Sequence, residues 1–311
     1  MILSVSRRTD VPAFFHRWFL GRIREGFALV RNPMNAGQVG RVTLTADTVD
    51  CIVFWTKNPA PMLADLDALA GWPCYFQFTL TPYGHDIEPG LPDKAKVIDT
   101  FRRLADRLGP ERVIWRYDPI LVSAGHTADF HAENFAAMAG ALRGYTKKAV
   151  VSFVEPYPKT RRSLAAHGIR PPDPEAKRDI AARLSAAARG NFLALEACAQ
   201  DIDLSHHGIG PARCIDADLA SRIAGWPLEI GRDKSQRPHC GCAASIDIGA
   251  YDTCPHGCLY CYANHSRAAA LENLQNHDAA SPILSGIPPD AADISERPAG
   301  TGRRTQGELF G

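Results

Sequence analysis

Three cysteines within eight residues form the part of the chain best suited to inorganic chemistry. Cys254, Cys258 and Cys261 lie at C-x3-C-x2-C spacing in the stretch TCPHGCLYCYAN, from Thr253 to Asn264. Thiolates on so short a loop can converge on one inorganic centre, and three ligands leave one iron of a four-iron cluster free to bind another molecule. The spacing therefore favours an iron-sulfur cluster. A closed structural zinc site is the alternative, although zinc sites usually use paired C-x2-C units.

An aromatic residue, Tyr260, directly precedes the third cysteine. With it, the stretch resembles the C-x3-C-x-aromatic-C signature of the radical S-adenosylmethionine (radical SAM) enzymes. The resemblance implies that a [4Fe-4S] cluster binds the amino and carboxylate groups of SAM at its free iron. It further implies that an electron from the cluster cleaves the sulfonium to a 5′-deoxyadenosyl radical, that Tyr260 helps to bind the cofactor, and that a flavodoxin- or ferredoxin-type protein supplies the electron.

The position of the motif departs from the pattern of that superfamily. Radical SAM enzymes carry the cysteines after the first strand, whereas here they follow residue 250. A circular permutation would reconcile the two if Ala244 to Asp252 contains the motif-bearing strand and the strand at 2–6 follows it in space. The sequence is also similar to an uncharacterised bacterial family that ends in such a cysteine block. Among radical SAM enzymes the spore photoproduct lyase group, which acts on a DNA lesion, is a distant analogue.

Composition limits the classes of protein to which the chain can belong. With 311 residues, a net charge of +1 and 22% charged residues, it has no global basic field for nucleic acid, which would need a local patch. The N-terminus lacks the pattern of a signal peptide, and no apolar stretch is long enough to span a bilayer. We therefore expect a soluble, cytoplasmic protein whose nine cysteines are metal ligands or thiols and not disulfides.

Short apolar runs alternate with helical stretches along most of the chain, which predicts parallel strands covered on both faces. The expected strands are 2–6, 27–31, 51–55, 74–80, 112–117, 149–154 and 192–197, with weaker ones near 228–231 and 244–249. The expected helices include 93–107, 129–142 and 174–188. This alternation favours an α/β fold, a TIM-like (β/α) barrel or partial barrel, in one domain over 1–276 with a Cys-rich segment at 198–261. Residues 277–311 have the composition of a flexible tail.

Polar residues recur where the expected strands end, which in a parallel barrel is the mouth that carries the chemistry. Arg116, Asp118, Glu155 and Glu196 are the candidate catalytic residues, and Lys57 and Asn58 are candidates for SAM binding. Several of these polar residues could instead cap helices, since Asn58 and Asp118 precede prolines. A hydrolytic or lyase-type barrel, with Asp118, Glu155 and Glu196 in acid-base roles, is a further alternative.

Four other cysteines bracket a loop-rich region. Cys198, Cys214, Cys240 and Cys242 would together complete a closed [4Fe-4S] or zinc site, so a second cluster is a candidate cofactor. His206, His207 and His239 are substitute ligands, and the alternative is that these cysteines are ordinary buried thiols. If neither site is reactive, the alternative function is that of a non-catalytic barrel protein that binds zinc or a structural cluster. Cys51 and Cys74 begin apolar strands and are expected in the core.

The C-terminal sequence TQGELFG contains a short docking pattern. Gln306, Leu309 and Phe310 resemble the Q-x-x-L-F peptide with which bacterial DNA-repair and replication proteins bind the sliding clamp. The apolar pair would fill a pocket while Gln306 sets the register. The segment Gln306–Phe310 therefore predicts the sliding clamp as a partner. The alternative is a frayed C-terminal tail that binds no partner.

Overall fold

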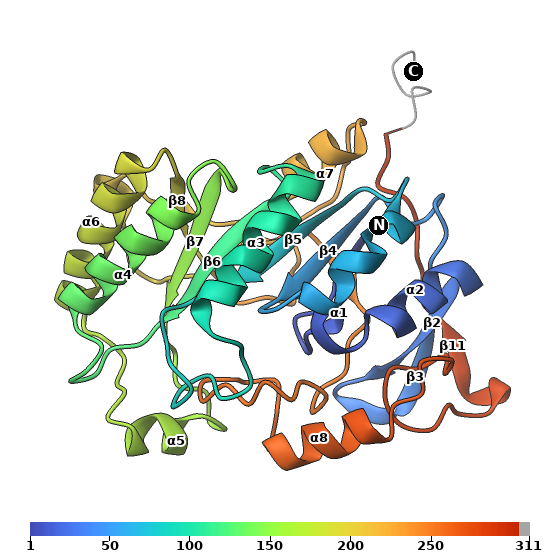
Figure 1. Cartoon of the computed structure of the whole chain (residues 1–311). Helices are drawn as coiled ribbons and strands as arrows, with labels where there is room; N and C mark the ends of the chain where they lie inside the picture. The colour runs from blue at the N-terminus through green and yellow to red at the C-terminus, as the bar shows by residue number, and fades with distance from the viewer. Residues whose placement is uncertain (305–311) are drawn as a thin grey trace.

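The centre of the protein is an eight-stranded parallel sheet, seen in a computed structural model that describes residues 1–304 (Figure 1). The strand order is β10-β1-β4-β5-β6-β7-β8-β9. The strands are β1 (Ile2–Val5), β4 (Cys51–Thr56), β5 (Cys74–Thr79), β6 (Val113–Ile120), β7 (Lys148–Phe153), β8 (Ala194–Ala197), β9 (Gly210–Pro211) and β10 (Ser245–Asp247). The predicted α/β class with a large parallel sheet is confirmed.

The last strand of the sheet in sequence lies beside the first. β10 pairs in parallel with β1, with Ile2 opposite Ser245 and Ser4 opposite Asp247. This is the neighbour relation that the proposed permutation requires, and it brings the segment before the cysteine motif to the N-terminal strand. At the two ends of the sheet, β9 and β10 do not pair with each other within residues 1–304. A closed barrel is therefore not shown.

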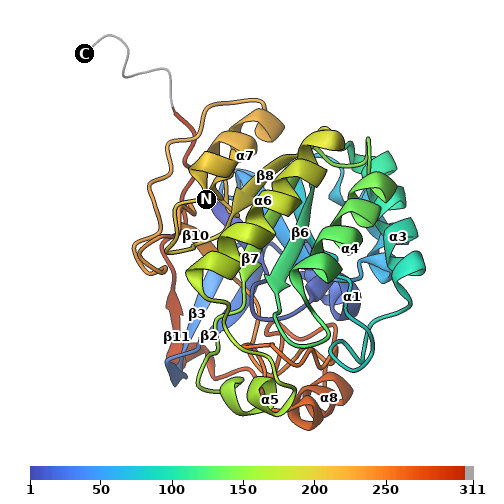
Figure 2. The same cartoon turned by 90° about the vertical axis from the view of Figure 1, so that its left-hand side faces the viewer.

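Helices cover one face of the sheet (Figure 2). They are α1 (Val11–Phe14), α2 (His16–Glu25), α3 (Lys94–Leu108), α4 (Ala128–Ala141) and α6 (Pro174–Gly190), with the 3-10 helix Ala60–Leu69 beside them. Three of them match the expected helices closely, and two begin with a side-chain cap. Thr127 accepts a hydrogen bond from the amide of Phe130 at 3.2 Å, and Asp173 accepts one from Ala176 at 2.9 Å. The helices α5 (Arg161–Ala166), α7 (Ala217–Ala224) and α8 (Arg267–Gln275) lie outside this layer.

The alternation of side chains along the strands divides the core between the two faces. In β4, Ile52 and Phe54 join the cluster beneath the helices, whereas Cys51 and Val53 join a second cluster on the other face. That second face is covered by α7 and by the loop-rich segment 198–243, and not by a layer of long helices. The sheet thus holds the Cys-rich segment against one face and the helices against the other.

Three expectations need correction. The weaker strand expected near 228–231 is not formed, because Leu228 makes only an isolated antiparallel bridge with Arg303. The run at 27–31 is not a strand of the main sheet. It forms β2 (Phe27–Asn32), which pairs antiparallel with β3 (Asn35–Thr43) because a tight turn joins them directly.

Residues 277–304 are not a flexible tail over the part that the structure describes. β11 (Ile294–Glu296) pairs in parallel with β3, and the N-terminal ammonium of Met1 donates a hydrogen bond to the carbonyl of Gly300 at 2.7 Å. Backbone pairing therefore overrides the polar composition of this stretch. The expected clamp-binding residues Gln306–Phe310 lie outside the described residues.

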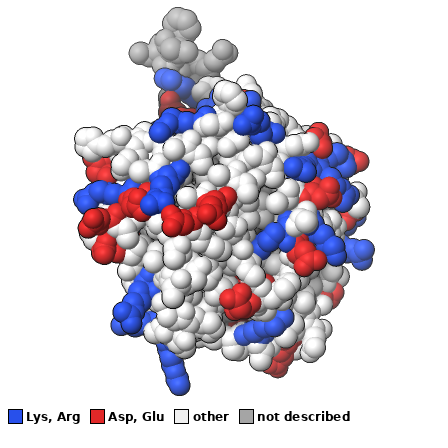
Figure 3. Space-filling view, turned by 60° about the vertical axis from the view of Figure 1, so that its left-hand side comes forward, with Lys and Arg blue, Asp and Glu red and all other residues white. Residues whose placement is uncertain are grey.

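The surface has no dominant charge on the face drawn in Figure 3, where basic and acidic side chains are interspersed between large uncharged areas. No helix within residues 1–304 has the length and apolar composition needed to cross a membrane.

Candidate functional site

A cavity of about 580 Å³ lies at the carboxyl ends of the strands, the place where parallel α/β proteins bind their ligands. Its walls come from the ends of β1, β4, β6 and β7, from the loops around 236–242, and from the segment that follows β10. The seven cysteines that were predicted to bind metal all line it: Cys254, Cys258, Cys261, Cys198, Cys214, Cys240 and Cys242. Cys51 and Cys74 are buried elsewhere, as expected.

The loop that carries the three motif cysteines is fastened to the strand ends through a buried ion pair. His256, between the first two cysteines, has its Nε2 2.9 Å from Oδ2 of Asp10, and both side chains are at most 5% exposed. Asp10 also accepts hydrogen bonds from the amides of Ala13 and Lys57. Burial raises the pKa of Asp10, but the contacts with His256, together with hydrogen bonds from Lys57 and Thr56, outweigh this and lower it overall. One carboxylate therefore connects the ends of β1 and β4 to the cysteine loop.

Close backbone contact fixes the same loop from a second side. The amide of Gly90 donates a hydrogen bond to the carbonyl of His256 at 2.8 Å. A Cβ at position 90 would lie 2.5 Å from that carbonyl oxygen and 2.6 Å from the Cα of His256. Only glycine fits this approach, because backbone atoms cannot yield as a side chain can.

The motif cysteines are half-buried in the cavity wall. Burial raises the pKa of all three thiols, that of Cys258 to about 12, while Lys57 acts in the opposite direction on Cys258. Metal binding would therefore release protons here, since thiolates are the ligands. In residues 1–304 no group of three or more His, Cys, Asp or Glu side chains is arranged as it stands to hold a single ion. A four-iron cluster is larger than an ion and needs its thiolates further apart.

A buried carboxylate organises the surroundings of Cys258. Glu88, whose side chain is 1% exposed, receives hydrogen bonds from Lys57 at 2.8 Å, from Thr81 at 2.7 Å, and from Lys94 and the hydroxyl of Tyr260. Burial would raise the pKa of Glu88, but the two ammonium groups outweigh it and lower it to about 2. The carboxylate thus stays ionised and holds Lys57 and Tyr260 at the cavity wall.

Arg116, which also lines the cavity, contacts both an acidic side chain and a thiol. Its guanidinium pairs with Asp118, which also accepts a hydrogen bond from Ser152, and its Nη1 is 2.8 Å from Sγ of Cys214. Arg116 is 6% exposed. The predicted residues Arg116 and Asp118 therefore form an ion pair beside the cysteines, in which Arg116 is buried and Asp118 is half-buried.

The four cysteines outside the motif are brought together. Sγ of Cys214 lies 3.4 Å from Sγ of Cys198, and the amide of Ile215, the residue after Cys214, lies 3.4 Å from Sγ of Cys242. All four residues are buried. The contacts from Cys198 and Cys242, reinforced by Arg116, lower the pKa of Cys214 well below its usual value despite burial.

Sequence reasoning missed a cationic residue of the cavity. Arg7 lies over the ring of Trp55, with 5.4 Å from its guanidinium carbon to the ring centroid, and its buried Nη2 has no hydrogen-bond partner. Arg7 follows the expected strand at 2–6, but the sequence of two adjacent arginines carries no signal that a nitrogen of one of them is buried without a hydrogen-bond partner.

Other predicted residues lie at the edge of the cavity or away from it. Glu155 lines it but pairs with Arg237 at 2.6 Å, and both are exposed. Glu196 and Asn58 are not among the lining residues. Glu196 binds Lys148 at 2.8 Å, and Asn58 faces the amide of Ala60 at the start of the 3-10 helix, as the capping alternative expected. His206, His207 and His239 do not line the cavity either.

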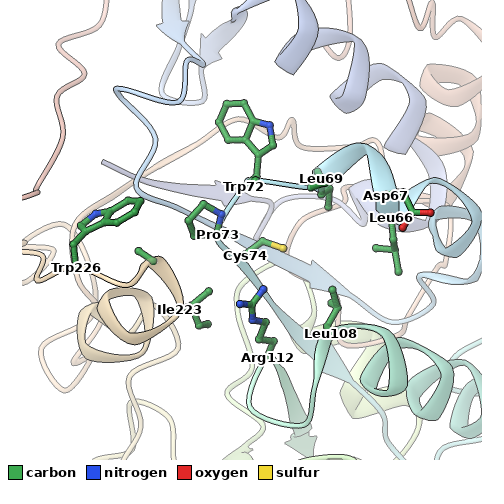
Figure 4. Close-up of a pocket in the computed structure, with 13 residues that line it drawn as sticks. Leu66, Asp67, Leu69, Trp72, Pro73, Cys74, Leu108, Arg112, Ile223 and Trp226 are labelled. Carbon is green, nitrogen blue, oxygen red and sulfur yellow. The ribbon is translucent and has the colours of Figure 1, made fainter.

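A second cavity of about 400 Å³ lies at the other end of the sheet (Figure 4). It is formed mainly by apolar residues that precede β5 and β6 and by α7, including Trp72, Leu108 and Trp226, with Cys74 and Arg112 beside them. It brings together no group of acids, histidines or cysteines comparable to the first cavity, so we assign the chemistry to the carboxyl ends.

Fold and cavity define an α/β protein with a parallel sheet and a cysteine-lined site at the carboxyl ends of its strands. A family profile described as a domain of unknown function, DUF1848, matches residues 2–263. The chain belongs to this family. Neither the curated proteins nor the solved structures contain a significant match. The family match ends two residues after Cys261, so all seven cavity cysteines fall within it.

Proposed function

We propose that the protein is a radical SAM enzyme that uses a [4Fe-4S] cluster held by Cys254, Cys258 and Cys261. The observation that carries the proposal is the convergence of these cysteines on a cavity at the carboxyl ends of a parallel sheet, beside β10 and β1. A volume of about 580 Å³ is within the range of small-molecule sites. The proposal extends to a partial barrel of permuted order, in which β10 is the motif-bearing strand.

The donor set suits the cluster and its cosubstrate. Three thiols on one loop match a cluster with one open iron, and Tyr260 and Lys57 lie beside Cys258. Arg7 has a buried nitrogen without a partner, which fits the carboxylate that SAM carries. When bound, the cluster would supply one electron for the reductive cleavage of SAM, and thereby a radical that abstracts hydrogen from a substrate.

The residues of this chain hold the components and exclude water. Asp10 and His256 fix the cysteine loop, while Glu88 keeps Lys57 charged next to Cys258. Burial favours the neutral form of Lys57, but Glu88 outweighs it and raises the pKa of Lys57. A fixed cation there would balance part of the negative charge of the thiolates. Arg116 and Asp118 would orient the substrate or the ribose of SAM from the opposite wall.

The rim of the cavity favours an anionic substrate with flat rings, which keeps a nucleic-acid lesion among the candidates. Tyr157, Tyr251 and Tyr262 are exposed lining residues, and the rings of Tyr157 and Tyr262 are 5.4 Å apart. Arg8 and Lys159 each lie 5.5 Å from the ring of Tyr251. Tyrosines interleaved with cations are the pattern with which proteins bind single strands and extruded bases.

The alternative is a protein that binds zinc or a cluster without catalysis. Metal analysis after anaerobic reconstitution tests the first part of the proposal. We expect about four more irons per chain in the parent than in Cys258→Ala. Cys74→Ala, which removes a thiol at the other end of the sheet, should keep the parent's iron. Equal iron in the Cys258→Ala protein, or zinc alone in the parent, would contradict the proposal.

A further inference from the structure

Four buried cysteines lie together in the same cavity, apart from the three-cysteine motif. Cys198 follows β8, Cys214 follows β9, and Cys240 and Cys242 precede β10. Three separate segments of the chain therefore bring their thiols to one place. Sγ of Cys198 and Sγ of Cys214 are 3.4 Å apart, Sγ of Cys242 is 3.4 Å from the amide of the residue after Cys214, and all four side chains belong to one buried cluster.

From this arrangement we infer a second metal centre with four thiolate ligands, Cys198, Cys214, Cys240 and Cys242. Four thiolates satisfy a zinc ion or a [4Fe-4S] cluster completely, so this centre would be closed, in contrast to the one at the motif. Its ligands are separate from those of the proposed SAM-binding cluster. It therefore does not depend on the proposed function.

The charges around these thiols suit such a centre. Nη1 of Arg116 lies 2.8 Å from Sγ of Cys214, and the amide of Ile215 lies 3.4 Å from Sγ of Cys242. Guanidinium and amide donors aimed at sulfur are the contacts that stabilise metal-bound thiolates and tune their centres. Plain core thiols need no buried arginine, whose desolvation costs free energy.

The segment between the four cysteines has little regular secondary structure, so a metal that links its ends would stabilise it. The segment 198–243 contains only one helix of eight residues, a strand of two residues and a single 3-10 turn. It nevertheless covers one face of the sheet. Linking residues 198, 214 and 240–242 through one centre would close two loops of this segment and stabilise its fold.

Within residues 1–304 no three of these side chains are placed, as they stand, to hold a single ion. Each cysteine has one side-chain torsion, and a staggered change of rotamer can turn its sulfur toward a shared centre. The adjoining cavity of about 580 Å³ leaves room for this change.

The test is the metal content of full-length protein in which Cys254, Cys258 and Cys261 are all replaced by Ala. After anaerobic preparation with iron, sulfide and zinc available, this triple variant should keep either about four irons or about one zinc per chain. The two results assign the centre to a cluster or to zinc. Adding Cys214→Ala to the triple variant should remove that metal, whereas adding Cys74→Ala should not.

A folded triple variant without metal, verified by circular dichroism, would overturn the inference. So would metal that survives the loss of Cys214, or two missing thiols in a thiol titration, which would indicate a Cys198–Cys214 disulfide. If the triple variant does not fold, Cys214→Ala in the parent provides the same test. Its metal content should fall by one complete centre, and an unchanged content would contradict the inference. Failure of SAM cleavage in the parent would leave these results unaffected.

Discussion

At the scale of single residues, buried charges next to the thiols separate this site from an ordinary core. Asp10, Glu88 and Arg116 are each at most 6% exposed, and each has a partner of opposite charge or a protonatable partner. Isolated buried charges cost several kcal/mol, so such groups persist where partners or function require them. Arg7 is the exception, because one of its nitrogens is buried without an acceptor.

Arg7→Gln tests whether that nitrogen binds an anion. We expect the affinity for SAM to fall by about tenfold to a hundredfold, the usual effect of losing a hydrogen bond to a charged group. Iron content should stay at the parent's value, because Arg7 contacts the cysteine loop through its backbone carbonyl, which accepts a hydrogen bond from the hydroxyl of Tyr262 at 3.0 Å and is kept in the variant. Isothermal titration under anaerobic conditions measures the affinity, and Arg17→Gln, on the exposed side of α2, is the matched control. Unchanged affinity in Arg7→Gln would remove Arg7 from the binding site.

At the scale of elements, loops at the strand ends position the cysteine loop, and helices pack against the strands. The loop before α3 reaches the cysteine loop through Gly90, and α4 is joined to the end of β6 through His131. The contact at Gly90 joins segments 166 residues apart, so local patterns could not predict it, whereas Tyr117 and His131 are 14 residues apart on a strand and the helix that follows it. Each makes an element's position sensitive to a single residue.

Gly90→Ala should displace the cysteine loop. The new Cβ would meet backbone of His256 at 2.5–2.6 Å, and we expect a loss of about 1–3 kcal/mol of unfolding free energy together with reduced iron retention. Chemical denaturation and iron analysis measure the two effects. Gly125→Ala is the control, because a Cβ there meets nothing within 4 Å. Equal behaviour of the two variants would show that the loop is not held at Gly90.

His131 predicts a pH-dependent stability unrelated to the metal. Nδ1 of its ring is 2.8 Å from the hydroxyl of Tyr117 and Nε2 is 2.7 Å from the carbonyl of Leu121. Burial lowers the pKa of His131 from its ordinary value of 6.5 to about 4. The unfolded chain therefore binds the proton first, so the contribution is complete above pH 6.5 and is lost as the pH falls through 4.

The lowered pKa sets an upper bound of about 3 kcal/mol on this change. Urea denaturation of the parent between pH 7 and pH 4 should show the loss. His131→Gln should be less stable at pH 7 and should change less over the same range. A parent and variant with parallel pH profiles would rule out His131 as the cause.

At the scale of the whole molecule, the sequence predicted the class of fold and the candidate metal-binding cysteines. It did not predict whether the sheet closes into a barrel or which strands pair outside the main sheet. Long apolar runs of β4, β5 and β7 predicted parallel strands, and three helices were located within a few residues. The hairpin at 27–43 is local, but the polar run of β3 has no apolar pattern that would identify it as a strand. The packing of 277–304 depends on pairing between distant segments, which composition does not encode. The cysteines could be recognised by their spacing, whereas Glu88, Asp10 and Arg7 are recognisable only from their burial and partners.

The central claim is that the cavity performs SAM chemistry, and the most direct measurement is the formation of 5′-deoxyadenosine. Anaerobically reconstituted parent protein, given dithionite and SAM, should release it, and Cys74→Ala should do the same. Cys258→Ala, which removes one ligand of the proposed open cluster, should release none above the level without protein. SAM cleavage that persists in Cys258→Ala, or that is absent from a parent with about four irons at the motif cysteines, would contradict the account.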